Sequence, residues 1–186
     1  MKSSNSFLTK DITMKTVFTI LGFLTSVFAS VTVQAAAAKV GDTAPSFTAK
    51  THAGEDFSLE ARKGKWTVLY FYPKAETPGC TTQACAFRDN LKKITAQDAE
   101  VYGISTDTVE TQKKFHEHHK LNFTLLADPD AAITEKFGAK MLALKMSKRW
   151  TYIIGPDLKI KSIDQDVDPA MDATKVAAKI ADLKKQ

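Results

Sequence analysis

The chain has 186 residues, of which 44% are hydrophobic and 25% are charged, and its formal net charge is +5. This is the composition of one ordinary globular domain, and no second domain is required. Because the basic residues are scattered among Asp and Glu, a solvated surface is favoured over a nucleic-acid-binding one, and no nucleic-acid partner is expected.

The beginning of the chain has the plan of an export signal. A long apolar run follows Met14 and Lys15, and no charged residue occurs between Lys15 and Lys39. The run passes into small residues, and the segment ending at Ala35 is a candidate cleavage site. We therefore expect the protein to be exported, to the periplasm.

Two forms of this segment are compatible with the sequence. Residues 1–35 are a signal peptide, for which Met14 is an alternative start, or they are an uncleaved anchor, because about 20 apolar residues can cross a bilayer. In either case the folded domain is expected at residues 39–186, with membrane contact only through an uncleaved segment.

The domain opens with a predicted hairpin and a buried strand. Residues 46–50 and 55–59 flank His52-Ala53-Gly54, which predicts a β-hairpin. The run Trp66–Tyr72 is continuously apolar, β-branched and aromatic, a pattern typical of a strand buried on both faces of a sheet. Pro73 is expected to end that strand.

A helix is predicted directly after this strand. From Cys80 to Ile94 apolar residues recur at helical spacing, with charged residues on the other side. Cys80 then lies in the first helical turn, where free backbone N–H groups and the positive end of the helix dipole favour a thiolate. The pattern predicts that Cys80 is a nucleophile. Thr77, three residues earlier, can direct its hydroxyl toward whatever the sulfur attacks.

The remaining elements alternate along the chain. They are a strand over 100–105, a helix over 109–119, a strand over 123–126, a helix over 131–137, a hairpin of 150–154 with 158–163, and a final helix over 172–183. Strands alternating with helices predict an α/β fold with a parallel sheet.

Several other roles for Cys80 and Cys85 must be weighed, since they are the only cysteines. Two cysteines are too few for a thiolate zinc site. A structural disulfide is disfavoured because five helical residues rise about 7.5 Å, beyond the ~7 Å Cα limit for a bridge. A thiol–disulfide oxidoreductase would carry Cys-x-x-Cys, which is absent. A copper-binding module that uses both cysteines and a histidine stays open as an alternative.

Three histidines cluster near the end of the helix predicted over 109–119. His116 and His119 share a face by helical spacing, so a metal-binding pair is conceivable. Lysines and a glutamate surround them, and this favours a solvated helix end.

The segment that contains both cysteines also resembles a known motif. The run Pro73-x-x-x-Thr77-x-x-Cys80 resembles the active-site motif of peroxiredoxins. The longer stretch YFYPKAETPGCTTQACAFRDN is similar to the subgroup called bacterioferritin comigratory protein or peroxiredoxin Q. The resemblance includes residues 40–47, 125–129 and 149–154, and so covers nearly all of the chain beyond residue 38.

This resemblance implies a fold and a set of site residues. The fold is α/β and thioredoxin-like, a mixed central sheet with helices on both faces and an N-terminal β-hairpin extension. Cys80 is implied to be the peroxidatic cysteine and Cys85 the resolving cysteine of the same chain. Thr77 and Arg149 are implied to hold the peroxide and the thiolate.

The resemblance also implies the reaction. A thiol-specific peroxidase would reduce hydrogen peroxide and organic hydroperoxides to water and alcohols, through a Cys80 sulfenic acid and a Cys80–Cys85 disulfide. A thioredoxin-like dithiol would recycle the enzyme, in antioxidant defence and cell redox homeostasis. No cofactor or metal ion is expected, and the protein is expected to be a monomer.

Overall fold

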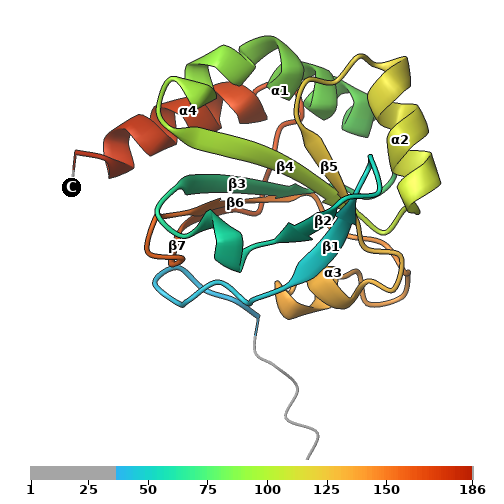
Figure 1. The fold of residues 1–186 in the computed structure, drawn as a ribbon, viewed down its shortest axis with the longest axis horizontal. Helices are drawn as coiled ribbons and strands as arrows, with labels where there is room; N and C mark the ends of the chain where they lie inside the picture. The colour runs from blue at the N-terminus through green and yellow to red at the C-terminus, as the bar shows by residue number, and fades with distance from the viewer. Residues whose placement is uncertain (1–36, 186) are drawn as a thin grey trace, which may run out of the picture. The chain divides into compact units, whose positions relative to one another are not determined.

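The computed structural model describes residues 37–185 (Figure 1). The predicted signal peptide or anchor at residues 1–35 lies outside this range and stays a prediction. No helix in the described part of the chain is both long enough and apolar enough to cross a membrane.

The helices and strands follow the predicted order, with ends shifted by a few residues. They are β1 (Thr48–Thr51), β2 (Asp56–Ser58), the 3-10 helix η1 (Glu60–Arg62), β3 (Trp66–Phe71), α1 (Pro78–Thr95), β4 (Ala99–Ser105), α2 (Val109–His118), β5 (Thr124–Ala127), α3 (Ala132–Lys136), β6 (Trp150–Ile154), β7 (Ile160–Asp164) and α4 (Asp172–Leu183). Only the short η1 was not predicted.

The strands form one mixed sheet of seven in the order β2-β1-β5-β4-β3-β6-β7. β4 is parallel to both β3 and β5, as alternation with helices predicts, whereas β6 pairs antiparallel with β3. The N-terminal hairpin of β1 and β2 adds antiparallel strands at the β5 edge. The prediction of a mixed sheet with an N-terminal hairpin is therefore confirmed.

Alternate residues of β3 serve two separate cores, because successive side chains of a strand point to opposite faces. Val68 and Tyr70 belong to one apolar cluster, and Leu69 and Phe71 belong to the other. This explains why the strand is apolar throughout, since both of its faces are buried.

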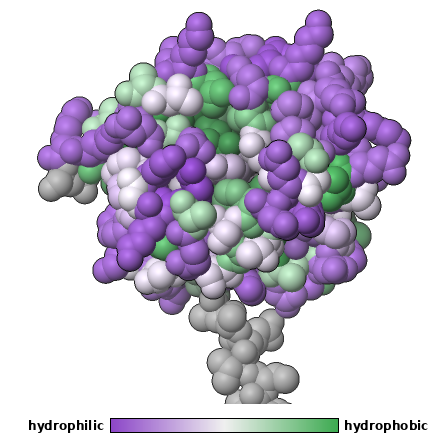
Figure 2. All heavy atoms as spheres, viewed as in Figure 1, coloured by the Kyte–Doolittle hydropathy of each residue, from purple (hydrophilic) through white to green (hydrophobic). Residues whose placement is uncertain are grey.

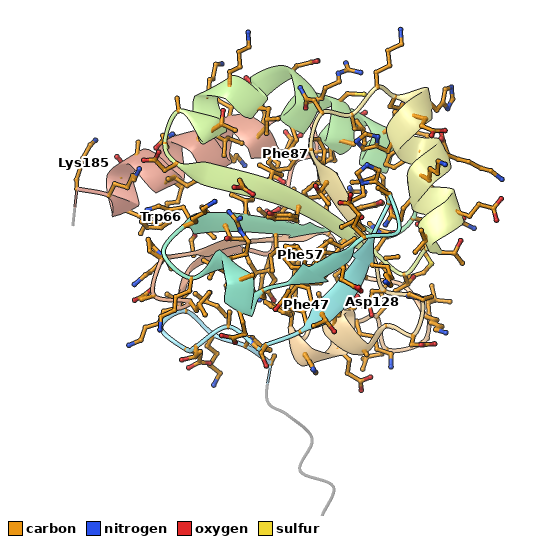
Figure 3. The ribbon with its side chains drawn as sticks, in the orientation of Figure 1. Phe47, Phe57, Trp66, Phe87, Asp128 and Lys185 are labelled. Atoms are coloured by element: carbon orange, nitrogen blue, oxygen red, sulfur yellow. The ribbon has the colours of Figure 1, made fainter. Side chains whose placement is uncertain are left out.

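Helices cover both faces of the sheet. α1, α2 and α4 lie on the face that holds Phe87 and Phe115, whereas α3 lies on the opposite face together with Phe47 and Phe137 (Figures 1 and 3). The longest helix of residues 37–185, α1, follows β3 after a short loop and packs on α4 and β4.

Hydrophilic residues cover most of the face drawn in Figure 2, and apolar residues appear there in small patches. This agrees with the solvated surface predicted from the mixing of acidic and basic residues along the chain.

Candidate active site

Cys80 lies where β3 ends and α1 begins. Thr77 is the N-cap residue of α1 with extended backbone angles, and Pro78 occupies the first helical position, where its fixed φ suits the helix and no N–H is needed. Cys80 is therefore in the first turn, as predicted, and its side chain is buried at 1% exposure. Backbone N–H groups of a first turn have no partner within the helix and point toward this end of it.

The loop between β3 and α1 is held by the neighbouring strand. The carboxylate of Asp107, just after β4, accepts hydrogen bonds from the N–H of Ala75 at 2.8 Å and from the hydroxyl of Ser105 at 2.7 Å. On the other side the hydroxyl of Ser147 donates to the carbonyl of Tyr72 at 2.6 Å. These bonds fix the path of the chain into α1.

Arg149 reaches Cys80 through the pairing of β6 with β3. Phe71 pairs with Trp150, so Arg149 lies at the end of β3 where α1 starts. Its Nη2 donates to Cys80 Sγ at 3.4 Å. A Cβ at Gly79 would lie 3.1 Å from the same Nη2, so the missing side chain of Gly79 lets the guanidinium approach closely. The structure thus brings together Cys80 and Arg149, which are 69 residues apart.

A buried polar chain holds the guanidinium. Arg149 Nη1 donates to Gln83 Oε1 at 2.6 Å, and Gln83 Nε2 donates to Asp172 Oδ2 at 2.6 Å. Thr151 Oγ1 donates to the same carboxylate oxygen at 2.8 Å. Neither Gln83 nor Asp172 was predicted from the sequence to belong to the site. Only the spacing of Gln83, three residues after Cys80 on the same helix face, could have indicated a link to the site.

Asp172 is an unusual carboxyl, because only one of its oxygens has partners. It is 1% exposed, and Oδ1 is buried without a hydrogen bond. Burial raises the pKa of Asp172 to about 6, although the hydrogen bonds from Gln83 and Thr151 oppose the shift. An ionised form thus has a high free energy here, because desolvation disfavours charge.

Asp172→Asn is therefore expected to change how stability depends on pH. Asp has a pKa near 3.9 in an unfolded chain, so the folded protein holds the extra proton between that value and about 6. A raised carboxyl pKa contributes stability at low pH that is lost as pH rises through the folded value. Between pH 4.5 and 7.5 wild type should lose roughly 2 kcal/mol relative to the variant.

Urea unfolding of both proteins at the two pH values, with cysteines kept reduced, measures this difference. At any single pH, the stability difference between the two proteins also contains the cost of the unpaired amide that Asn introduces. Only the change of this difference with pH therefore reports the pKa of Asp172. Parallel pH dependence of the two proteins would show that Asp172 keeps an ordinary pKa.

Thr77 lies at the start of the site with its hydroxyl proton already engaged. Its Oγ1 donates to the carbonyl of Lys74 at 2.9 Å, and it makes no capping bond to α1. A hydroxyl retains two acceptor positions when its proton is used. The hydroxyl oxygen of Thr77 therefore keeps its capacity to accept a hydrogen bond.

Cys85 lies on α1 with Cys80, and both thiols are free. Cys80 is buried and Cys85 is partly exposed. Because one continuous helix contains both residues, the predicted separation of about 7.5 Å along the helix axis applies, and a bridge requires the helix to open.

His116 does not pair with His119, the metal-binding arrangement that the sequence left as the less favoured alternative to a solvated helix end. α2 ends at His118, and the ring of His116 stacks instead on His52 with centroids 3.7 Å apart. Burial lowers the pKa of both stacked histidines, and the like charge of His116 lowers that of His52 further.

His118 and His119 contact the loop before α1. Glu76 Oε1 lies 3.1 Å from His118 Nδ1, and Glu76 Oε2 lies 2.9 Å from His119 Nε2. Burial alone would raise the pKa of Glu76, but the hydrogen bonds from the two histidines outweigh it, and the pKa is lowered. Across residues 37–185, this is the one group of three metal-ligating side chains, and it contains neither cysteine. A copper site that joins both cysteines to a histidine is thus not present in this range.

Comparison with known proteins agrees with the geometry. The model of the AhpC/TSA family matches residues 40–163. Peroxiredoxin Bcp of Escherichia coli is 41% identical over 134 residues, covering 69% of this chain and 86% of that protein. The chloroplastic Peroxiredoxin Q of Sedum lineare is 45% identical over 130 residues, covering 69% of this chain and 66% of that protein.

Solved structures show the same fold. Peroxidoxin BcpB from Mycobacterium tuberculosis matches with a TM-score of 0.73 and 34% identity, over 78% of this chain and 98% of that one. A mutant PrxQ from Xylella fastidiosa matches with a TM-score of 0.75 and 26% identity, over 80% of this chain and 99% of that one. The predicted thioredoxin-like α/β fold is confirmed.

Proposed function

This chain belongs to the AhpC/TSA family and is a peroxiredoxin, a thiol peroxidase, and from that premise we propose that Cys80 reduces hydrogen peroxide and organic hydroperoxides. The observation that carries this assignment is the contact of the Arg149 guanidinium with Cys80 Sγ at 3.4 Å, in the first turn of α1. The thiolate is the reactive form of cysteine, and the always-charged guanidinium of Arg149 lies directly against the sulfur that reacts.

In the first step the Cys80 thiolate attacks the terminal oxygen of the hydroperoxide. A sulfur–oxygen bond forms as the oxygen–oxygen bond breaks, and the leaving oxygen takes a proton to become water or an alcohol. Sulfur is oxidised by two electrons to a sulfenic acid, and the peroxide is reduced by the same two electrons.

A thiolate by itself does not explain a fast attack on a peroxide. The site must in addition stabilise the negative charge that develops on the peroxide oxygens. Arg149 and the free N–H groups of the first turn of α1 are the donors for that charge. Thr77 accepts the hydrogen bond of the peroxide O–H, since its own proton is held by the Lys74 carbonyl.

In the second step the Cys85 thiolate attacks the Cys80 sulfenic sulfur. Hydroxide leaves and is protonated to water, and the Cys80–Cys85 disulfide forms within the chain. A dithiol reductant then returns both thiols, and a thioredoxin-like protein is the reductant that membership of the peroxiredoxin family implies. This cycle supports a role in peroxide defence and cell redox homeostasis.

Arg149→Met is expected to slow the first step while the protein stays folded. Methionine keeps much of the side-chain length but has no charge and no donor. Loss of a donor to developing oxygen charge costs roughly 10²- to 10³-fold in rate, so the second-order rate constant for peroxide attack should fall by about that factor. Stopped-flow mixing of reduced protein with hydrogen peroxide measures it.

Lys148→Met is the matched control. It removes a neighbouring positive charge whose Nζ lies over the Trp150 ring, 4.4 Å from the ring centroid, away from Cys80. A rate that falls equally in both variants would indicate a general charge effect, and an unchanged rate in Arg149→Met would reject the assignment of Arg149.

A further inference from the structure

Glu76, His118 and His119 form a cluster beside the catalytic turn, which we call the Glu76 cluster. Their ligating atoms all lie within 4.8 Å of one another. The cluster joins segments that are 42 and 43 residues apart in the chain. It lies partly at the surface, since the side chain of His118 is 70% exposed and that of His119 is 17% exposed. Ions in solution can therefore reach it.

The end of α2 explains why two consecutive histidines converge. Neighbouring residues within a helix point in different directions, but α2 ends at His118, and His119 has left helical geometry as the C-cap residue. The two rings then lie with centroids 4.4 Å apart on the side that faces Glu76. Glu76 itself has a left-handed backbone with φ 62, which is uncommon for a residue other than glycine.

We propose that the Glu76 cluster is a binding site for a divalent transition-metal ion of the zinc type. Two imidazole nitrogens and one carboxylate oxygen are a ligand set that Zn²⁺ takes, with a water molecule in the fourth position. Each imidazole nitrogen already lies near one of the two Glu76 oxygens, at 3.1 Å for His118 and 2.9 Å for His119, which is near the spacing between two ligand atoms around an ion with bonds of about 2.0–2.1 Å. The ion replaces the hydrogen bonds, and small rotations of surface side chains bring the three atoms together. This site was not expected from the sequence, which predicted no metal ion.

A bound ion is expected to oppose the unwinding of α1 that disulfide formation requires, an effect that rests on the function proposed above. Glu76 lies four residues before Cys80. Three residues after Cys85, the Arg88 guanidinium donates to the carbonyl of His119 at 2.7 Å. The segment that must unwind to form the disulfide is therefore tied at both ends to the same end of α2. A metal ion strengthens the first tie and opposes unwinding.

Zinc titration of the full chain with Cys80→Ser and Cys85→Ser tests the site itself. These substitutions remove the thiolates, which would bind zinc independently. We expect one equivalent of zinc to bind, measured by calorimetry in metal-free buffer. Even an outer-shell change costs about 10- to 100-fold in metal affinity, so adding Glu76→Gln or His118→Asn, each of which removes a ligand, should weaken binding by at least about tenfold.

His116→Asn is the matched control, because His116 stacks on His52 outside the cluster. Its affinity for zinc should equal that of the parent protein. Absence of binding to the parent, or equal binding to the parent and both cluster variants, would overturn the site. Neither result depends on peroxidase activity, so both are distinguishable from a failure of the proposed function.

Hydrogen exchange on the same thiol-free protein tests the consequence. Zinc should increase protection at the start of α1 and the end of α2, and it should not do so in Glu76→Gln. Zinc that binds through the cluster but leaves protection at the start of α1 unchanged would overturn the claim that the ion opposes unwinding.

Discussion

Cys80→Ser is expected to abolish peroxide consumption, by roughly three orders of magnitude or more, because a serine hydroxyl is not ionised at neutral pH and cannot replace the thiolate. The substitution is nearly isosteric at a fully buried position, so the fold should persist. Peroxide loss in the presence of a dithiol reductant measures the effect, with circular dichroism as the control for folding.

Cys85→Ser separates attack from resolution. The first oxidation should proceed at the wild-type rate, because Arg149 contacts the sulfur of Cys80 and not that of Cys85. The cycle should then stop at the sulfenic acid, which further peroxide converts to sulfinic acid. Mass spectrometry of the intact protein detects these added oxygens. Loss of peroxide reactivity in Cys85→Ser but not in Cys80→Ser would reverse the two roles.

Formation of the Cys80–Cys85 disulfide is expected to loosen α1 and to lower the stability of the protein. A cross-link that closes so short a loop lowers the entropy of the unfolded chain and would by itself stabilise the folded protein by about 2 kcal/mol. Opening the first turns of α1 removes several helix hydrogen bonds at about 1 kcal/mol each. It also exposes Cys80 and Ala84, which are buried in the reduced form. The net loss should be on the order of 3 kcal/mol.

The same opening separates Gln83 from Arg149 and Asp172, which removes a donor from a carboxylate that is already under-satisfied. A buried group that loses its partner is costly, so this loss adds to the destabilisation. The disulfide should thus lower the free energy of unfolding of this protein, whereas most cross-links raise it.

Hydrogen exchange of the reduced and oxidised protein measures the loosening. Protection should fall across residues 80–95, most strongly in the first half, and α3 on the opposite face of the sheet serves as the internal control. Equal or greater protection after oxidation would mean that the cysteines are not both helical when they react.

The sequence by itself determined the elements around Cys80. The continuous apolar run predicted β3, the helical spacing of apolar residues predicted α1, and together they placed Cys80 in the first helical turn. These features are local, because hydrogen bonding and burial of neighbouring residues decide them. The role of Arg149 came only from the resemblance, since the pattern around it is equally typical of a surface arginine.

The tertiary structure alone decided which side chains meet Cys80. The antiparallel register of β6 on β3 brings Arg149 to the sulfur, and the packing of α4 on α1 brings Asp172 to Gln83 across 89 residues. The end of α2 turns His118 and His119 toward Glu76, a contact that helical spacing within α2 could not indicate. Such contacts depend on strand register, helix ends and packing between distant segments, and the periodicity of a single segment carries no information about them.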